Sequence, residues 1–131
     1  DALNRAGITP RDLCAIQAHA TGTMLGDLAE SLALRRSLGS TLDQIPVHAP
    51  KGQLGHLLGA AGAVETILAF QALGDGILPR TLNCDPVDPE IMLNLNNANH
   101  ASLPDGDSQR FLLKNTFGFG GHNISLILSS P

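Results

Sequence analysis

The chain has 131 residues and a net charge of −4, and its four aromatic residues are all Phe. It contains no run of basic residues, so its composition excludes a nucleic-acid-binding surface. The hydrophobic fraction of 43% is that of a globular domain with a sizeable core, and the low charged fraction of 15% indicates a chain that buries further surface against other protein.

Cysteine content and hydropathy indicate the compartment. Cys14 and Cys84 form no CxxC pair and are too few for a disulfide framework, which is typical of a reducing, intracellular compartment and not of a secreted protein. No apolar run approaches the roughly 18 residues that span a membrane, so we expect no membrane partner. Because the chain begins at Asp1 with a pattern like the end of a helix, we also expect a fragment of a longer protein.

The first part of the chain predicts a strand, a helix and a second strand. Residues 13–16 form a short apolar run that is typical of a buried strand. Apolar residues at helical spacing, among them Leu25 and Leu32, then predict an amphipathic helix that ends at Gly39. Residues 46–49 predict the second strand.

Residues 59–73 are apolar on nearly all sides and too few to span a membrane. This pattern predicts a central, buried helix. Glu65 is its one carboxylate, and because burying an unpaired charge is costly, we expect Glu65 to have a partner.

The last part of the chain predicts a loop region and then a hairpin. Residues 74–107 are rich in Pro, Asn, Asp and Gly and predict mostly loop, with a possible strand at 91–95. Residues 110–116 and 123–128 predict two strands joined through a glycine-rich tip. The order strand, helix, strand, helix, strand, strand predicts a layered α/β fold.

The stretch from Pro50 to Gly62 combines Lys51, His56 and four glycines ahead of an apolar segment. Lysine is scarce in this chain, and its position in a nearly apolar run indicates a functional charge that needs a carboxylate. Five positions would place Lys51 and His56 on different sides of a helix, so we expect a buried, irregular loop shaped by glycine. The alternative is a tight strand-to-helix connection from which Lys51 extends into solvent.

Polar residues also follow the first predicted strand and occupy the hairpin tip. His19 could donate a hydrogen bond or act as a general base, and Thr21 and Thr23 could hold an extended polar ligand. Ligands bind at the carboxyl ends of strands in α/β sheets, so we expect these residues to converge with Lys51 and the tip at 117–122. The alternative for His19 is a core histidine bonded to the backbone.

Three segments carry a resemblance to a known family: AHATGTMLGD at 18–27, KGQLGHLLGAAG at 51–62 and NTFGFGGHN at 115–123. In this order and at this spacing they resemble the C-terminal half of a β-ketoacyl-acyl-carrier-protein synthase, a condensing enzyme with a thiolase-like fold. The resemblance implies that residues 1–131 are that half, with the nucleophilic cysteine in a missing N-terminal half. Cys14 and Cys84 are then structural.

The resemblance implies a catalytic role for both histidines. His19 and His56 stand where the family keeps two imidazoles that donate to one thioester oxygen, and each imidazole needs its tautomer fixed by a neighbour. Lys51 matches the family's lysine and organises the histidines. Its implied partner is Glu30, and Asp27 is a second candidate.

The resemblance also implies substrate-binding residues. Thr21 and Thr23 match threonines that contact the pantetheine arm of a carrier protein. Phe119 matches a gating phenylalanine whose backbone N–H contributes to an oxyanion hole, and Phe117 lies beside it. The glycines around them supply the mobility that a gate requires.

Several members of this family have a monovalent-cation site, which Glu65 and Asn115 match. Lys114 stands where a small hydroxyl residue is usual, and Gln17 replaces an asparagine. We therefore expect no metal, and we expect the Lys114 ammonium to take the cation's place against Glu65.

The remaining histidines belong to no catalytic motif. His122 follows the glycine tip at a position where the family carries threonine or histidine, and we expect it to pack against the protein. For His48 and His100 we expect side chains that are solvated or hydrogen-bonded.

The implied activity of the full-length protein is decarboxylative condensation of an acyl thioester with malonyl-acyl-carrier-protein, giving 3-oxoacyl-acyl-carrier-protein in fatty-acid elongation. No cofactor is implied. The implied partners are acyl carrier protein and a second copy of the chain, in bacterial cytoplasm or mitochondrial matrix. The fragment alone is expected to be inactive.

Other functions remain open at this point. The chain could belong to a polyketide ketosynthase or to a non-catalytic, chain-length-factor-like subunit, although retention of His19, Lys51 and His56 disfavours the latter. A phosphate-binding loop is disfavoured because Lys51 precedes the glycines. A zinc site is disfavoured because no third ligand lies at suitable spacing.

Overall fold

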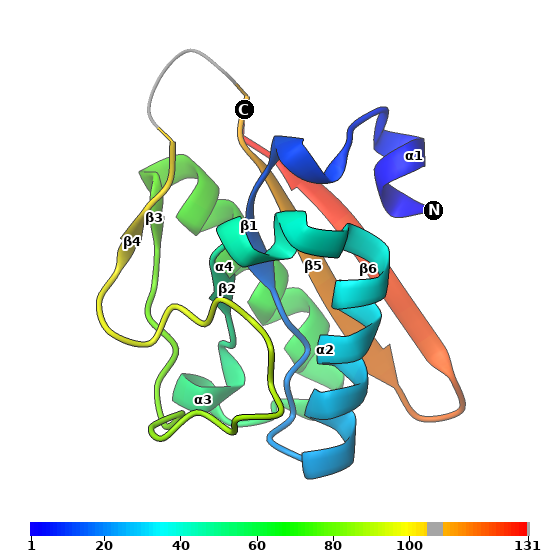
Figure 1. Ribbon diagram of the computed structural model, residues 1–131, viewed down its shortest axis with the longest axis vertical. Helices are drawn as coiled ribbons and strands as arrows, with labels where there is room; N and C mark the ends of the chain where they lie inside the picture. Colours follow the sequence, from blue (N-terminus) through cyan, green and yellow to red (C-terminus); the bar gives the residue numbers. More distant parts are fainter. Residues whose placement is uncertain (105–108, 131) are drawn as a thin grey trace.

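The computed structural model describes residues 1–104 and 109–130 (Figure 1). In chain order the elements are α1 (Ala2–Ala6), β1 (Leu13–Gln17), α2 (Met24–Leu38), β2 (Val47–His48), α3 (Lys51–Leu54), α4 (Ala61–Asp75), β3 (Ile77–Leu78), β4 (Ala101–Ser102), β5 (Phe111–Gly118) and β6 (His122–Ser129). Short 3₁₀ turns lie at Pro10–Asp12, Gly39–Gln44 and Leu58–Ala60. The predicted layered α/β order is confirmed.

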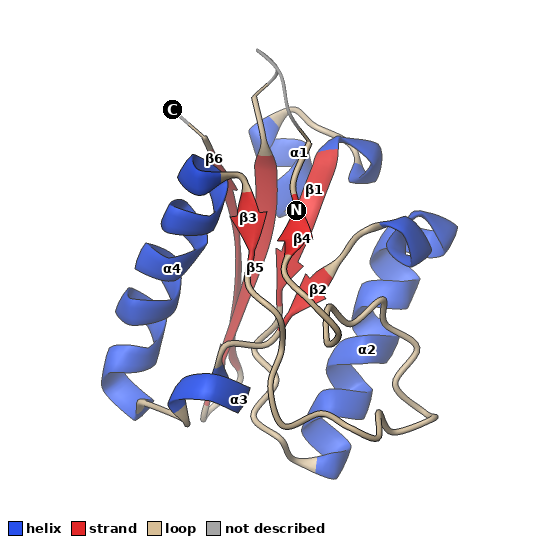
Figure 2. Cartoon of the chain, turned by 90° about the vertical axis from the view of Figure 1, so that its left-hand side faces the viewer, coloured by secondary structure: helices blue, strands red, loops and turns tan. Residues whose placement is uncertain are grey.

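The main sheet has the strand order β2-β1-β5-β6, and β3 pairs with β4 separately. Strands β2 and β5 both run parallel to β1, whereas β6 is antiparallel to β5. Helices α2 and α4 cover opposite faces of this sheet (Figure 2). Each helix encloses its own hydrophobic core, because side chains on a strand alternate between the two faces.

Parallel pairing brings the ends of three strands to one edge of the sheet. Gln17 at the end of β1 is opposite His48 at the end of β2 and opposite Lys114 in β5. The residues that follow β1 and β2, and the last residues of β5, therefore emerge side by side. This edge is where the expected site residues lie.

Helix α2 ends as predicted, with Gly39 at its C-cap and a positive φ of 62°. The face that it buries differs from the predicted one. Ser31, Leu34 and Leu38 are buried, whereas Leu25 and Leu32 are exposed. The reason is that α2 packs by its C-terminal half against the sheet, while its first turn borders a cleft.

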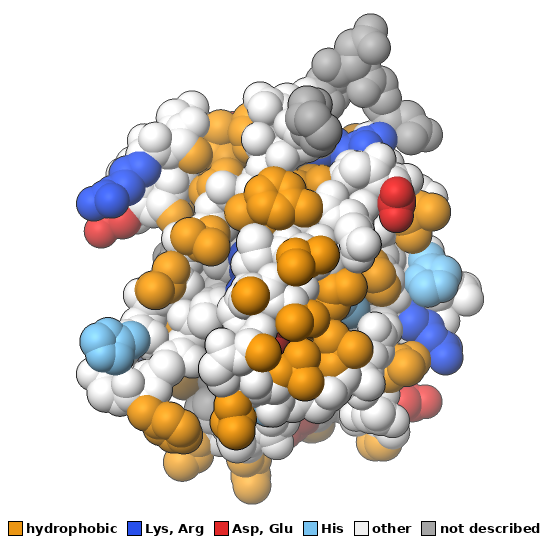
Figure 3. Space-filling view, turned by 180° about the vertical axis from the view of Figure 1, so that it is seen from behind, with side chains coloured by type: hydrophobic (Ala, Val, Ile, Leu, Met, Phe, Trp, Pro, Cys, Tyr) orange, Lys and Arg blue, Asp and Glu red, His pale blue; other side chains and the backbone are white. Residues whose placement is uncertain are grey.

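The helix predicted at 59–73 is present, but the prediction that it is buried is wrong for one of its sides. Helix α4 buries Glu65 and Leu73 against the sheet, but Ile67 and Phe70 are 58% and 49% exposed. Hydrophobic side chains also gather on the surface seen from behind (Figure 3). Helix α4 is apolar on both sides, and within the described residues only one side is covered.

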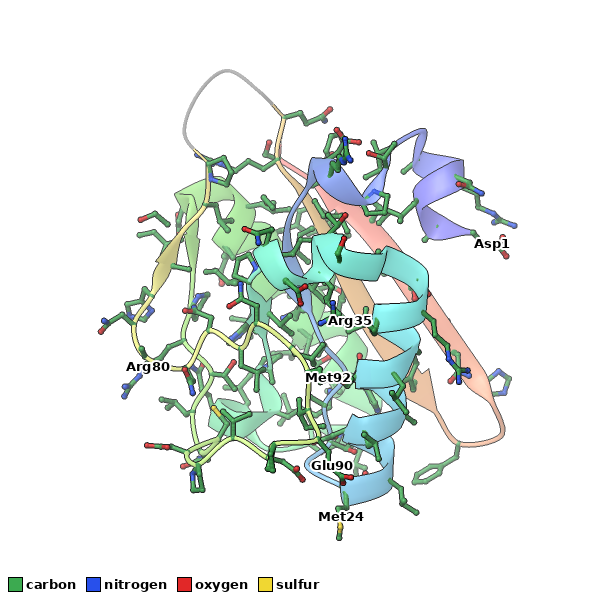
Figure 4. The ribbon with its side chains drawn as sticks, viewed as in Figure 1. Asp1, Met24, Arg35, Arg80, Glu90 and Met92 are labelled. Carbon is green, nitrogen blue, oxygen red and sulfur yellow. The ribbon has the colours of Figure 1, made fainter. Side chains whose placement is uncertain are left out.

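The possible strand at 91–95 is also not formed. Leu95 makes a single isolated bridge with Val47, and tight turns at Leu93–Leu95 and Leu95–Asn97 interrupt further pairing. Arg35 fixes this segment to α2, because its Nη2 donates to the Met92 carbonyl at 3.0 Å (Figure 4). Within the described ranges, no helix has the length and apolar character needed to cross a membrane.

Candidate active site

Two imidazoles meet at the edge where β1, β2 and β5 end. His19 follows β1 and His56 follows α3, and their ring centroids lie 5.8 Å apart with an interplanar angle of 89°. Phe117 of β5 is the third ring, at 5.3 Å from His19. Three segments that are far apart in the sequence thus converge, as the positions of the strand ends indicated.

Lys51 contributes a buried ammonium behind these rings. Its side chain is 4% exposed, and its Nζ donates to Glu65 Oε1 at 2.6 Å. The same Nζ lies 3.3 Å from Nδ1 of His19. The expected pairing with Glu30, or with Asp27, is wrong, because the Lys51 side chain extends from α3 toward α4 and meets the carboxylate there.

Glu30 instead accepts hydrogen bonds from backbone N–H groups and from one side chain. Its Oε1 accepts hydrogen bonds from the His19 N–H and from Nδ2 of Asn115, and its Oε2 accepts from the Ala20 N–H, each at 2.9 Å. Asp27 has a similar local role, because its Oδ1 accepts from the Gly22 N–H at 3.2 Å. Burial raises the pKa of Asp27. Both carboxylates hold the turn that presents His19.

The expected contact between Lys114 and Glu65 is present. Lys114 is 1% exposed, its Nζ lies 3.4 Å from Glu65 Oε2, and it also donates to Oγ1 of Thr116. Burial lowers the pKa of Lys114, and the Glu65 carboxylate opposes that shift. The second matched residue, Asn115, faces the other side of β5 and bonds to Glu30, so the structure does not bring its side chain to Glu65.

The tautomers of both imidazoles follow from their neighbours. An ammonium and a backbone N–H have protons to donate and no lone pair to offer. Nδ1 of His19 therefore accepts from Lys51 Nζ, and Nδ1 of His56 accepts from the Leu58 N–H at 3.1 Å. In the neutral form each ring then carries its proton on Nε2 and can donate from there.

Electrostatics favour that neutral form for His19. Burial lowers the pKa of His19, and the Lys51 ammonium lowers it further.

Sequence reasoning missed the strained backbone near each imidazole. Ala20, next to His19, has φ 37°, and Leu58, two residues after His56, has φ 49°, in a region that non-glycine residues seldom adopt. No residue type at these positions signals that conformation.

The imidazoles open onto a cleft of about 640 Å³. It is lined by His19, Ala20, Thr21, Thr23, Gly26, Asp27, Glu30, His56, Leu58, Gly59, Phe117, Gly118 and Phe119. The hydroxyls of Thr21 and Thr23 lie 3.0 Å apart at its border. Phe119 is 98% exposed at the tip of the β5–β6 hairpin, so it stands over the cleft without packing into the protein.

The loop around His56 is not buried as expected. Pro50, Lys51 and Ala61 are buried, but residues 53–60, which include His56, are exposed. Gly55 has φ 72°, which ends α3 and turns the chain so that His56 points back toward His19. Gly52 allows α3 to lie close to the backbone at Leu82, because a side chain at position 52 would collide with the Leu82 carbonyl oxygen.

The cysteines and the remaining histidines lie outside the cleft. Cys14 and Cys84 are free thiols, and burial raises the pKa of Cys14, whose Sγ donates to the Phe111 carbonyl at 3.1 Å. His100 and His122 are exposed, so the expected packing of His122 is wrong. The reason is the hairpin tip, where Gly120 and Gly121 both have φ 83° and turn the chain outward.

His48 is buried at 3% exposure, and its Nδ1 has no hydrogen-bond partner among the described residues. The expectation of a solvated or hydrogen-bonded side chain is therefore wrong. Burial lowers the pKa of His48 to about 4. Among the described residues no group of three His, Cys, Asp or Glu side chains is arranged to hold a metal ion.

His48 makes stability depend on pH. Its folded pKa of about 4 lies below the ordinary 6.5, so the unfolded state binds more protons between these values. The stabilisation is complete above pH 6.5 and is lost as the pH falls toward 4, with a total of about 3 kcal/mol. Denaturant unfolding from pH 7.5 to 4.5 should therefore show a flatter profile for His48→Leu. The control His100→Leu should keep the wild-type profile, and an unchanged profile for His48→Leu contradicts the assignment.

The fold and the site together define a class of α/β protein in which two imidazoles meet at one sheet edge and a buried lysine contacts one of them. Comparison with known proteins identifies the family to which the chain belongs. The family model of the β-ketoacyl synthase C-terminal domain matches residues 1–85. The chain therefore belongs to the β-ketoacyl synthase family.

The curated relatives are much longer than this chain. The 3-oxoacyl-[acyl-carrier-protein] synthase 2 of Mycobacterium tuberculosis is 46% identical over 125 residues, which cover 95% of this chain and 28% of that protein. A 3-oxoacyl-[acyl-carrier-protein] synthase homolog of Saccharomyces cerevisiae is 42% identical over 134 residues, covering 96% and 30%. The chain thus spans less than a third of the length of the relatives it matches.

Solved structures agree with the family. A β-ketoacyl synthase from Burkholderia phymatum superposes with a TM-score of 0.85 at 33% identity, over 96% of this chain and 29% of that one. A type II polyketide ketosynthase, solved in complex with its acyl-carrier protein, superposes with a TM-score of 0.88 at 30% identity, over 98% and 30%. The thiolase-like α/β fold expected from the sequence is thereby confirmed.

Proposed function

We propose that this chain is the C-terminal part of a longer condensing enzyme, a 3-oxoacyl-[acyl-carrier-protein] synthase that joins an acyl thioester to malonyl-acyl-carrier-protein in fatty-acid elongation. One observation carries the proposal. His19 and His56 meet at one cleft, and Nδ1 of each ring accepts a hydrogen bond, which leaves both Nε2 protons free to donate.

Two such donors suit decarboxylation of a malonyl thioester. As the bond to the carboxylate breaks and carbon dioxide leaves, the electron pair moves through the α-carbon onto the thioester oxygen. N–H donors aimed at that oxygen stabilise the enolate where its charge develops. The enolate carbon then attacks an acyl thioester held on a cysteine outside this chain, and the cysteine thiolate leaves.

The cleft border suits a carrier-bound substrate. Thr21 and Thr23 place two hydroxyls beside each other for an extended polar arm, and Phe119 is positioned as a mobile cover. The structure of a related ketosynthase with its acyl-carrier protein supports that partner. We assign the full-length protein to a homodimer.

A ketosynthase of polyketide synthesis is the second candidate, because a type II polyketide ketosynthase superposes on nearly the whole chain. A non-catalytic partner subunit fits less well, since both imidazoles and Lys51 are kept in a connected arrangement. A bacterial relative, and a relative from Schizosaccharomyces pombe whose name includes the word mitochondrial, support a place inside the cell, in bacterial cytoplasm or mitochondrial matrix.

The test is His56→Ala in the full-length protein. Release of carbon dioxide from malonyl-acyl-carrier-protein should fall by about 10²–10³-fold, because one donor to the enolate oxygen is removed. Transfer of an acyl group onto the nucleophilic cysteine should continue, since it requires no enolate. His122→Ala removes another exposed histidine, one outside the cleft, and should leave both steps unchanged. Normal decarboxylation in His56→Ala would refute the proposed role.

A further inference from the structure

A row of buried contacts runs from β5 to the catalytic cleft. Lys114 Nζ donates to Thr116 Oγ1 and lies 3.4 Å from Glu65 Oε2. Glu65 Oε1 lies 2.6 Å from Lys51 Nζ, which lies 3.3 Å from Nδ1 of His19. Two ammonium groups therefore share one carboxylate, one on each oxygen.

This row is deep inside the protein. Counted over the whole residue, the exposed fractions of Lys114, Glu65 and Lys51 are 1%, 3% and 8%. A buried charge costs several kcal/mol unless it is paired, so a second lysine beside an already paired carboxylate is not explained by stability alone. Leu112, two positions earlier on the same face of β5, is buried in the apolar core. A methionine at 114 would satisfy the packing at lower cost.

The two oxygens of Glu65 indicate a role for Lys114, the second lysine. The terminal torsion of a glutamate is broad, so a single cation does not determine which oxygen faces it. With Lys114 on Oε2, Oε1 is the oxygen left for Lys51. Without Lys114, Oε2 is buried without a donor, and the most favourable remedy is for the Lys51 ammonium to bridge both oxygens. That movement takes Lys51 away from His19.

We propose that Lys114 is a positioning residue that acts through Glu65 and Lys51 to keep a proton donor on Nδ1 of His19. By this arrangement His19 retains the tautomer that donates from Nε2 into the cleft. The catalytic consequence rests on the proposed function. The effect on the distance between Lys51 and His19 does not depend on it.

The experiment uses Lys114→Met in the full-length protein, with two readouts. A crystal structure should show the Lys51 Nζ to His19 Nδ1 distance beyond about 3.5 Å, outside hydrogen-bond range. Decarboxylation of malonyl-acyl-carrier-protein should lose about tenfold in kcat, as expected for one charge-assisted hydrogen bond, with little change in KM. Lys114→Arg keeps a cationic donor near Glu65 and should restore most of the rate.

Leu112→Ala is the matched control, because it perturbs the same face of β5 with no contact to Glu65. It should lower the melting temperature without a change in the Lys51–His19 distance. On a Glu65→Gln background, Lys114→Met should add no further loss, since its route to His19 is already broken. If Lys114→Met does not fold, Lys114→Leu, which is also uncharged and has no hydrogen-bond donor, decides in the same way.

A Lys114→Met protein that keeps Lys51 within hydrogen-bond distance of His19 overturns the proposal, as does a loss in kcat that Lys114→Met still causes on the Glu65→Gln background. A wild-type protein without any decarboxylation refutes the proposed function instead. In that case the distance measured in the variant still decides the role of Lys114.

Discussion

His19→Ala in the full-length protein is expected to lower kcat for malonyl decarboxylation by about 10²–10⁴-fold. Of the two imidazoles, His19 is the one that the buried charged side chains contact. Lys51 Nζ donates to its Nδ1, and Glu30 accepts a hydrogen bond from its backbone N–H. The variant loses both the Nε2 donor and the ring that Lys51 orders. Carbon dioxide release from labelled malonyl-acyl-carrier-protein measures the effect.

The loss should fall on kcat, with KM changed by less than about threefold, because the donor acts on charge that exists only in the transition state. Burial and Lys51 lower the pKa of His19, so the neutral ring should persist below the ordinary value of 6.5. The acid limb of the wild-type kcat profile that belongs to His19 should lie below that pH. His100→Ala, an exposed histidine, serves as control. A His19→Ala enzyme within tenfold of wild type contradicts the assignment.

Glu65→Ala is expected to destabilise the protein by about 3–5 kcal/mol. The substitution leaves the ammonium groups of Lys51 and Lys114 buried beside each other without their shared carboxylate. Both lysines must then lose a proton or draw water into the core. Denaturant unfolding at neutral pH, followed by circular dichroism, measures the change.

Asp43→Ala is the matched control, because it breaks an ion pair of the same 2.6 Å length, with Arg35, on the surface. Its effect should be small, since solvent screens exposed charges. The triple variant Lys51→Met, Glu65→Leu, Lys114→Met removes all three charges and should recover most of the lost stability without activity. If Glu65→Ala is as stable as Asp43→Ala, the charges are not held as the structure shows.

Local patterns were sufficient for the elements of the sheet and for the position of the cleft. The apolar run at 13–16 and the strand-like run at 110–116 predicted strands from their own residues, without knowledge of the segments beside them in the fold. Parallel strands end at one edge, so the residues that follow them had to converge. The motifs around His19, His56 and Phe119 therefore predicted a shared cleft before any contact was known.

Partner choice was beyond the sequence, because it depends on where side chains from distant elements meet. Glu30 and Glu65 both lie on helices, and nothing in their local patterns shows that Glu30 binds backbone N–H groups while Glu65 binds both lysines. For the same reason the sequence indicated that α4 is apolar on both sides, but not which side the sheet covers.

The sequence by itself determined the family, the α/β order and the two imidazoles, since these depend on residue type and spacing. Only the tertiary structure decided how the imidazoles are prepared. The strained turns at Ala20 and Leu58 aim the rings, and a carboxylate shared by Lys51 and Lys114 orders the charge behind them. These features arise from packing α3 and α4 against the sheet edge, which brings together groups that are 14 and 49 residues apart in the chain.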